Sequence, residues 1–351
     1  MYKVVLEKRA FISSVRNFTT TFFAIIAALI LGAVFIQLNG VNPLLAYGKI
    51  IERVIGSSYG LSEALVKMIP LTFTGLAVAI ALENKIWNIG AEGQYLMGAF
   101  FVTAYVLNFP QLPIYLNLPV ILLIGMLGGA LWALIPAFLK IRFSVNEVIT
   151  SLLMNYVALN IVDYFVYGPW LGPDNFPKTR IFPVNAQLPQ IGFGRLHSGL
   201  FLLIIFVILT YVVLKYTPYG FKVRIIGSSA KAGHYAGFNV KRIIFSVFLL
   251  SGALAGVAGM IDLCGLQYRL LNTFSADYGY TGIIVAWLSK SNPFIICFFA
   301  FFLSVIITGA EIIQISLGLP ASIGTILQAL ILFSILGAEL FKNYKVKLIK
   351  C

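Results

Sequence analysis

The chain has 351 residues, of which 60% are hydrophobic and 11% charged, with a formal net charge of +13. Soluble domains carry about 25% charged residues, so this composition excludes an ordinary water-soluble protein and indicates a polytopic membrane protein. A basic balance also suits nucleic-acid binding, but most of the 25 lysines and arginines fall in the predicted cytoplasmic segments, as the positive-inside rule requires.

Hydropathy predicts ten membrane-spanning helices, each of which needs about 20 apolar residues. They cover residues 17–38, 64–82, 91–108, 118–139, 145–167, 199–216, 243–262, 278–289, 293–310 and 319–339. Two of them, 64–82 and 278–289, are short or interrupted by glycine, which predicts broken helices. The expected fold class is all-α, with one transmembrane domain over residues 1–351 and about ten helices. Ten crossings, together with the charge pattern, place both termini in the cytoplasm.

The apolar sequence is interrupted at residues 83–94 by a polar stretch that ends in Asn-Ile-Gly-Ala-Glu-Gly-Gln. A carboxylate at mid-bilayer depth costs about 2.5–3.5 kcal/mol and usually faces a cavity or a partner. Gly90 and Gly93 allow the backbone to leave the helix, which is tolerated only where protein or water covers it. The stretch indicates a bent helix beside a path; the alternative is a short cytoplasmic loop before an ordinary helix. The candidate path residues are Asn88, Glu92 and Gln94.

Polar residues recur on the helix predicted after Arg142. Glu147, Ser151 and Asn155 repeat every four residues and therefore lie on one helix face. Such groups suit a path for hydroxylated or heterocyclic solutes, but they also suit hydrogen bonds between helices, worth about 0.6 kcal/mol each. Both interpretations stay open. The candidate path or gate residues here are Asn146, Glu147, Ser151, Asn155 and Tyr156.

Two loops and one glycine pattern stand out further along the chain. The external loop, 168–198, is rich in proline and glycine and either receives an external partner or is a solvated connector. The inner loop, 217–242, has small residues at 228–233 that predict a compact helix along the membrane face; the alternative is a plain basic loop. Gly252 and Gly256 form a small-xxx-small pattern that predicts close helix packing.

The sequence holds no recognisable enzyme motif. It lacks G-x-x-x-x-G-K-[ST], so the chain is not expected to bind ATP through a P-loop. Its three cysteines and two histidines have no metal-site or disulfide spacing. Glu92 and Glu147 lack a nearby nucleophile for acid–base chemistry. We therefore predict a chain without catalytic residues, metal ligands or a bound cofactor.

Several strings in one order point to a family. They are Trp-Asn-Ile-Gly-Ala-Glu-Gly-Gln at 87–94, Lys-Ile-Arg-Phe-x-Val-Asn-Glu-Val-Ile-Thr at 140–150, Leu-Met-Asn-Tyr at 153–156, and shorter matches at 235–237, 251–256, 278–283, 318–320 and 328–332. Over about residues 70–335 the chain resembles the membrane permeases of bacterial ABC importers for nucleosides and simple sugars. The strings at 88–94 and 146–150 are most similar to the nucleoside branch.

The resemblance implies a type II-importer-like permease that pairs, as a homo- or heterodimer, around a central path. It implies a cytoplasmic ATP-binding subunit that uses the ATP, an external solute-binding lipoprotein, a small-molecule substrate and surrounding membrane lipid, with no nucleic acid. It also implies a segment that couples the permease to the ATPase. That segment consists of Gly227, Ser228, Ser229, Ala230, Lys231, Ala232, Gly233, His234, Tyr235, Ala236 and Gly237. Ser229 and the pair Ala232-Gly233 depart from the Asn and the Ala-Ala common in the family, which affects only the detail of docking.

The expected function is conduction of a nucleoside, with a purine nucleoside favoured, across the bacterial cytoplasmic membrane. A simple-sugar ABC permease and an ion-coupled secondary transporter are the alternatives, since broken helices and intramembrane carboxylates also suit the latter. A neighbouring gene for a P-loop ATPase would favour the ABC interpretation. Loss of uptake with a proton uncoupler at constant ATP would favour the ion-coupled secondary transporter.

Overall fold

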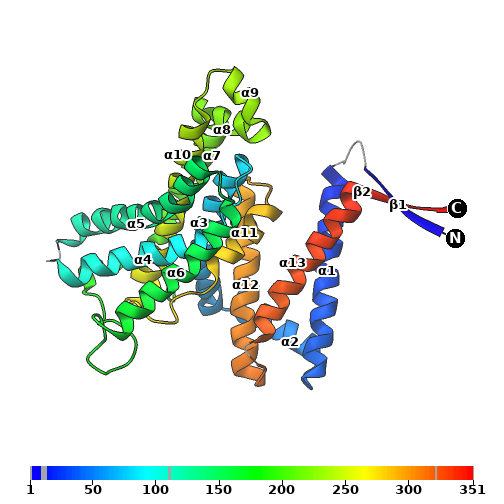
Figure 1. Ribbon diagram of the computed structural model, residues 1–351. Helices are drawn as coiled ribbons and strands as arrows, with labels where there is room; N and C mark the ends of the chain where they lie inside the picture. Colours follow the sequence, from blue (N-terminus) through cyan, green and yellow to red (C-terminus); the bar gives the residue numbers. More distant parts are fainter. Residues whose placement is uncertain (1, 9–13, 110–111, 321, 351) are drawn as a thin grey trace. The chain divides into compact units, whose positions relative to one another are not determined.

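The computed structural model describes residues 2–8, 14–109, 112–320 and 322–350, and these form two compact units, Met1–Ala64 with Val305–Cys351 and Leu65–Ser304 (Figure 1). The first unit holds β1 (Tyr2–Lys8), α1 (Ser14–Leu38), α2 (Pro43–Ile50), the π-helix η1 (Ile51–Ile55), α13 (Ser322–Asn343) and β2 (Tyr344–Lys350). Two long helices, α3 (Ser58–Glu83) and α12 (Pro293–Leu317), contain the boundaries between the units.

All the named elements of the second unit are helices, joined by turns and loops. In chain order its further elements are α4 (Ala91–Asn108), α5 (Ile114–Phe143), α6 (Glu147–Tyr167), η2 (Val184–Ala186), α7 (Gly199–Tyr216), α8 (Pro218–Ser228), α9 (Ala230–Tyr235), α10 (Val240–Asp262), η3 (Leu263–Gln267) and α11 (Tyr278–Leu288). The predicted all-α fold class is confirmed apart from the antiparallel strand pair β1 and β2, which was not predicted.

Each of the ten predicted segments is helical, but the prediction of about ten membrane crossings is not confirmed. Six helices in the described residues are long and apolar enough to cross a membrane: α3, α5, α6, α7, α10 with its continuation η3, and α12. A seventh span results if residues 22–38 and 43–55, bent by 116°, count as one. The segment predicted as the short helix 64–82 is in fact the 26-residue helix α3.

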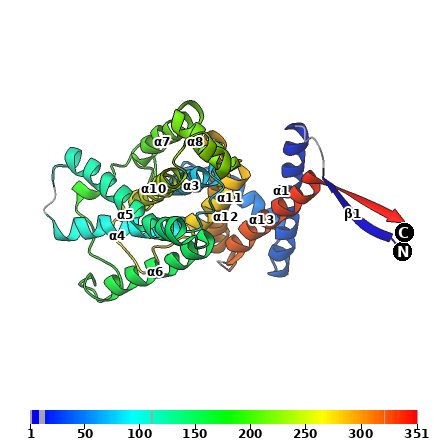
Figure 2. The ribbon, with the colours of Figure 1, turned by 45° about the horizontal axis from the view of Figure 1, so that its top comes forward.

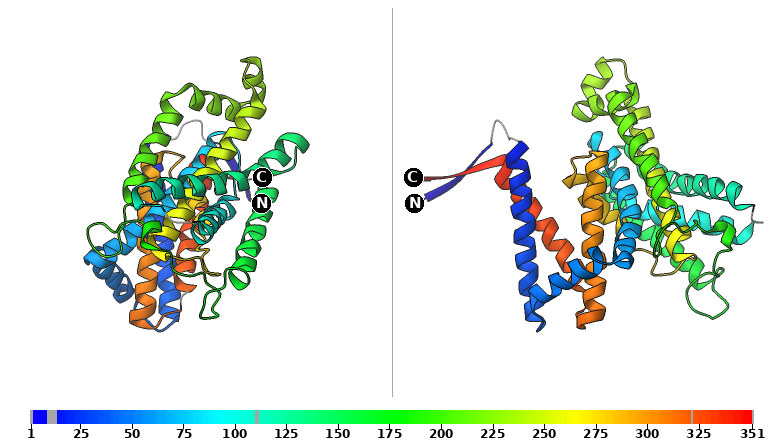
Figure 3. Two further views of the ribbon diagram at one scale, coloured as in Figure 1. Left: turned by 90° about the vertical axis from the view of Figure 1, so that its left-hand side faces the viewer. Right: turned by 180° about the vertical axis from the view of Figure 1, so that it is seen from behind.

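In the first unit α1 and α13 run alongside each other (Figure 3). The contact is close at Gly32, where an added Cβ would lie 2.3 Å from Leu327 Cδ2. The Tyr47 hydroxyl of α2 donates a 2.7 Å hydrogen bond to the Leu29 carbonyl oxygen of α1. The strands β1 and β2 pair antiparallel, with Tyr2 opposite Lys350 and Lys8 opposite Tyr344.

The core of the second unit is built by α4, α5 and α10, which pack against one another (Figure 2). These helices approach until their backbones touch. A Cβ at Gly256 would lie 2.1 Å from the Gly125 oxygen of α5, and a Cβ at Gly98 of α4 would lie 2.4 Å from Gly256. Gly252 meets Gly129 in the same way. The structure confirms the close packing predicted from the Gly252–Gly256 spacing.

The predicted external loop, residues 168–198, is fastened to the segment that follows η3. The Thr179 amide donates to the Leu270 carbonyl oxygen at 2.9 Å, and the Phe182 amide donates to the Tyr268 carbonyl oxygen at 2.8 Å. The loop is therefore folded against this segment, which is compatible both with a site for an external partner and with a solvated connector.

His197, at the end of this loop, gives the protein a pH-dependent stability. Its ring is 1% exposed and lies against Gly265, where an added Cβ would be 2.6 Å away. Burial lowers its pKa from 6.5 to about 4. Between these values the unfolded chain binds a proton that the folded chain excludes, so stability falls as the pH drops. At pH 5 the loss is about 2 kcal/mol relative to pH 7.

We expect His197→Gln to lose this part of the pH dependence. The measurement is thermal unfolding in detergent, followed by tryptophan fluorescence, at pH 7, 6 and 5. His234→Gln is the matched control, because that ring is exposed, and it should keep the wild-type profile. If wild type and His197→Gln lose equal stability from pH 7 to pH 5, the assigned effect of His197 is wrong.

Candidate functional site

The break between α3 and α4 is a turn of seven residues, 84–90. Helix α3 ends at Glu83, and Lys85 has a left-handed backbone with φ 54°, which stops helical propagation. The turn lies against α8. The Asn84 side-chain amide donates a 3.1 Å hydrogen bond to the Val223 carbonyl oxygen, and a Cβ at Gly227 would lie only 2.3 Å from the Glu83 oxygen. The predicted broken helix and the predicted coupling segment therefore touch.

Two predicted site residues, Asn88 and Gln94, form a reciprocal amide pair inside the protein. Asn88 Nδ2 donates to Gln94 Oε1 at 2.8 Å, and Gln94 Nε2 donates to Asn88 Oδ1 at 3.1 Å. Asn88 Nδ2 also donates to Ser251 Oγ of α10 at 2.8 Å, and Ser251 donates to the Ala77 carbonyl oxygen of α3 at 2.6 Å. The pair joins α3, α4 and α10, with both amides about 1% exposed.

Asn155 of α6 closes the other side of the break. Its Oδ1 accepts from the Gly93 amide at 2.8 Å, while its Nδ2 donates to the Ile89 carbonyl oxygen at 2.9 Å and to the Tyr280 hydroxyl at 3.1 Å. Glycine at position 93 permits this close approach, because an added Cβ would lie 2.8 Å from Asn155 Oδ1 and 3.0 Å from the Asn155 Cα. Asn155 thus satisfies backbone groups that the broken helix leaves without helical partners.

Glu92 joins α4 to the beginning of α11. Ser275 Oγ donates to Glu92 Oε1, and the Gly279 amide donates to Glu92 Oε2, both at 2.6 Å. A carboxyl group at a helix N-terminus satisfies amides that have no helical acceptor. The side chain is 2% exposed, and an added Cβ at Gly279 would lie 2.3 Å from the Glu92 nitrogen. Glu92 is a tie between two helices in this chain.

The remaining predicted path residues lie elsewhere. Ser151 is buried and meets the break at Gly90, where an added Cβ would lie 3.0 Å from Ser151 Cβ. Asn146 is exposed and caps α6, and Glu147 forms a 2.7 Å ion pair with Lys140 across the α5–α6 turn. Tyr156 is 60% exposed. The structure therefore gathers Asn88, Glu92, Gln94, Ser151 and Asn155 at the break and leaves Asn146, Glu147 and Tyr156 apart from it.

Three partners of this buried cluster were missed from the sequence. Ser251 stands inside the small-residue pattern, which predicted packing alone. Ser275 and Tyr280 flank the start of α11, and the string at 278–283 marked that region without assigning a role. A search for polar residues next to glycine within apolar segments would have found Ser251 and Tyr280.

The predicted coupling segment forms the end of α8, all of α9 and the turn after it, which project beyond α7 and α10 (Figure 1). The Ser229 side chain caps α9 by accepting from the Ala232 amide at 3.2 Å. Gly233 packs on α8, where an added Cβ would lie 2.7 Å from Ile226 Cγ1. Tyr235 is 92% exposed. The predicted compact helix exists, and the loop interpretation is wrong.

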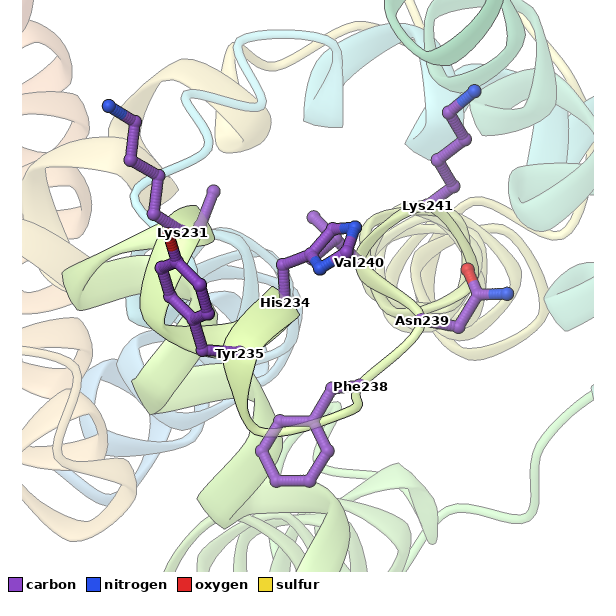
Figure 4. A pocket seen from close by; sticks show the side chains of 8 residues that line it. Lys231, His234, Tyr235, Phe238, Asn239, Val240 and Lys241 are labelled. Carbon is purple, nitrogen blue, oxygen red and sulfur yellow. The ribbon is translucent and has the colours of Figure 1, made fainter.

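A hollow of about 830 Å³ lies between α9 and the start of α10 (Figure 4). The ring of His234 points toward Val240, while Lys231 and Lys241 extend from the two helices. The lining residues are Ala230, Lys231, His234, Tyr235, Phe238, Asn239, Val240 and Lys241. No group of His, Cys, Asp and Glu side chains that could hold a metal ion occurs among the residues described.

Comparison with known proteins places these features in context. Residues 60–336 match the family described as branched-chain amino acid transport system / permease component. The chain is 35% identical to a glucose ABC transporter permease of Haloferax volcanii, over 97% of this chain and 93% of that protein. It is 30% identical to a nucleoside ABC transporter permease of Lactococcus lactis, with 91% of each covered. It is 31% identical to a guanosine ABC transporter permease of Bacillus subtilis, over 88% and 90%. No solved structure matches the chain.

Proposed function

Because the chain belongs to the family of transport-system permease components, we propose that it is the membrane subunit of an ABC importer for a nucleoside or a monosaccharide. Support for the substrate class comes from the relatives, which are named for guanosine, nucleosides and glucose. They agree on a neutral solute rich in hydroxyl groups. The higher identity to the glucose permease gives the monosaccharide as much weight as the nucleoside predicted from the strings at 88–94 and 146–150.

The observation that carries the mechanism is the contact between α8 and the α3–α4 turn. Gly227 and Val223 of α8 lie against Glu83 and Asn84 at distances that leave no room for an intervening side chain. We infer that a displacement of α8 also displaces the turn. In our proposal, the cytoplasmic ATP-binding subunit docks on the segment 227–237 and moves α8. The side-chain amides of Asn88, Gln94 and Asn155, together with Glu92, transmit this movement to α6, α10 and α11, which switches access to the path.

The proposed partners follow from the same reasoning. ATP would be bound and hydrolysed by the partner subunits, and this chain would bind no cofactor of its own. A second permease, either a copy or a related chain, would close the path, and an external solute-binding lipoprotein would deliver solute near the folded loop 168–198. In this proposal both termini lie in the cytoplasm, and the membrane lipid surrounds the apolar helix faces.

Solute-stimulated ATP hydrolysis tests this function. The complex, co-purified and reconstituted in lipid, should hydrolyse ATP about fivefold or more faster when the binding protein and one of guanosine, uridine or glucose are added; a fivefold change in rate is about 1 kcal/mol. The solute that stimulates ATP hydrolysis shows whether the transporter imports a nucleoside or a monosaccharide. An ion-coupled transporter would instead show uptake that collapses with a proton uncoupler at constant ATP. That result, without any ATPase co-purifying, would overturn the proposal.

A further inference from the structure

The outer half of α6 carries a polar stripe that its own subunit leaves uncovered. Tyr156, Asn160, Asp163 and Tyr167 follow one another in steps of four, three and four, which places them on one helix face. Tyr156 and Tyr167 are 60% and 58% exposed, Asn160 is exposed, and Asp163 is half-buried. This face is distinct from the buried face that carries Ser151 and Asn155.

The depth of the stripe makes contact with lipid unfavourable. Helix α6 has 21 residues and is about 30 Å long at 1.5 Å per residue, the thickness of the hydrocarbon core. Tyr156 lies near its middle, and Asn160 and Asp163 follow about 6 and 10 Å further out. An amide and a carboxylate facing lipid there would lose hydrogen-bonding partners at a cost of kilocalories per mole. The stripe must face water, solute or protein.

The stripe carries hydrogen-bond acceptors that have no donor within the described part of the chain. Asn160 Nδ2 donates to the Tyr156 carbonyl oxygen at 2.7 Å, and the Tyr167 hydroxyl accepts from Asn272 Nδ2 at 3.0 Å. Within the described part of the chain, the Asn160 side-chain oxygen and the Asp163 carboxyl group have no hydrogen-bond donor. Two acceptors beside an exposed phenol are suited to the hydroxyl groups and the ring face of a sugar.

The stripe continues onto α11 through Tyr280. This side chain is half-buried, receives the Asn155 hydrogen bond described above, and lies within electrostatic reach of Tyr156 and Asp277. Toward the inner end of α6, the same face continues with Ile149 and Leu153, which are 56% and 57% exposed. The polar face therefore ends, toward the inner end of α6, at these two apolar side chains.

We propose that Tyr156, Asn160, Asp163 and Tyr280 form the solute-contacting wall of the path. The Asp163 carboxyl group and the Asn160 side-chain oxygen accept hydrogen bonds from hydroxyl groups of the solute. The rings of Tyr156 and Tyr280 cover the ring face of the solute. The buried cluster at the break then supports this wall through Asn155 without touching solute. The inference rests on the proposed function and adds to it the residues that meet the nucleoside or monosaccharide.

Thiol labelling of the assembled transporter tests the wall. In a chain with Cys264, Cys297 and Cys351 changed to alanine, Asn160→Cys and Asp163→Cys are labelled with a charged, membrane-impermeant methanethiosulfonate. Leu127→Cys is the matched control, because Leu127 on α5 is 58% exposed and apolar. We expect positions 160 and 163 to react about tenfold or more faster than position 127, since thiolate forms in water and not in lipid. Saturating guanosine or glucose, whichever is transported, should slow the reaction.

Two results would overturn this inference. Equal labelling at positions 160 and 127 would place the stripe in lipid. Oxidative cross-linking of Asn160→Cys between two permease chains, insensitive to solute, would make it a packing interface between subunits. Solute-stimulated ATP hydrolysis by the wild-type complex distinguishes failure of this inference from failure of the proposed function. If ATP hydrolysis is stimulated but positions 160 and 163 are not labelled faster than position 127, only the assignment of the solute-contacting wall is wrong. If ATP hydrolysis is not stimulated, the proposed function itself is refuted.

A second variant pair keeps the test independent of cysteine chemistry. Asp163→Leu removes the acceptor and should raise the KM for uptake about tenfold, the effect of losing one hydrogen bond to a charged group. Asp163→Asn keeps one acceptor oxygen and should lie between Asp163→Leu and wild type. Equal KM values for all three proteins would contradict contact between Asp163 and solute.

Discussion

Replacing Gly227 with leucine is expected to reduce solute uptake by the assembled transporter about tenfold or more, while the permease still folds and reaches the membrane. A Cβ at this position would lie 2.3 Å from the Glu83 oxygen and 2.9 Å from Asn84 Cα. Both are backbone atoms that cannot rotate away as a side chain could. Overpacking of this kind typically costs 1–3 kcal/mol.

The effect on transport follows from where this cost is incurred. If α8 must sit against the α3–α4 turn in one state of the transport cycle, Gly227→Leu destabilises that state selectively. A difference of about 1.4 kcal/mol then changes the population of the two states tenfold. Gly227→Ala also introduces the clashing Cβ but fewer further atoms, so its effect should have the same sign and be smaller.

The experiment compares uptake with ATP hydrolysis in the same reconstituted complex. Gly227→Leu should uncouple the two, so that ATP is hydrolysed without proportionate uptake. Phe221→Leu is the matched control, because it places leucine at an exposed position of the same helix away from the turn. Normal uptake in Gly227→Leu would refute the role of this contact as the link to the break.

The helices could be predicted from the sequence because hydropathy acts over whole segments. Each predicted segment is a helix, yet hydropathy also predicted crossings where the structure has shorter helices, as in α11. The reason is physical: an apolar run of about a dozen residues buries equally well in protein or in lipid. Helix α8 was missed although Thr217-Pro218, a cap followed by proline, marks its first turn.

The sequence singled out the five residues that the structure gathers at the break, together with Asn146, Glu147 and Tyr156, which lie apart from it; the contacts of these residues were not predictable. Asn88, Glu92 and Asn155 stood out because amides and carboxylates are rare within apolar sequence. Their partners lie far away in the chain: Asn155 contacts the Ile89 carbonyl oxygen, and Glu92 contacts Ser275. A periodic pattern gives the face of a helix, and no pattern within one segment identifies what that face meets. Of the exposed stripe on α6, only Tyr156 was singled out from the sequence, for this reason.

Removal of the Glu92 carboxyl group is expected to lower the stability of the folded protein. Glu92→Ala leaves the buried Gly279 amide without an acceptor and also removes the bond from Ser275, both 2.6 Å long in the wild type. Such a loss costs about 3 kcal/mol, which corresponds to a fall in Tm of about 5 °C or more. Glu92→Gln keeps one acceptor and should lose less, and Ser275→Ala removes only one bond, worth about 1 kcal/mol.

The same variants separate a structural tie from a solute contact. If Glu92 holds α4 to α11, Glu92→Gln and Ser275→Ala are coupled, because each removes part of one network, and the double variant loses less stability than the two single variants together. Uptake per folded molecule should then keep the wild-type KM. If Glu92 instead touches solute, KM rises in Glu92→Gln and is unchanged in Ser275→Ala, with little change in Tm. Since Glu92 is 2% exposed within its subunit and both its oxygens have donors, we expect the first outcome.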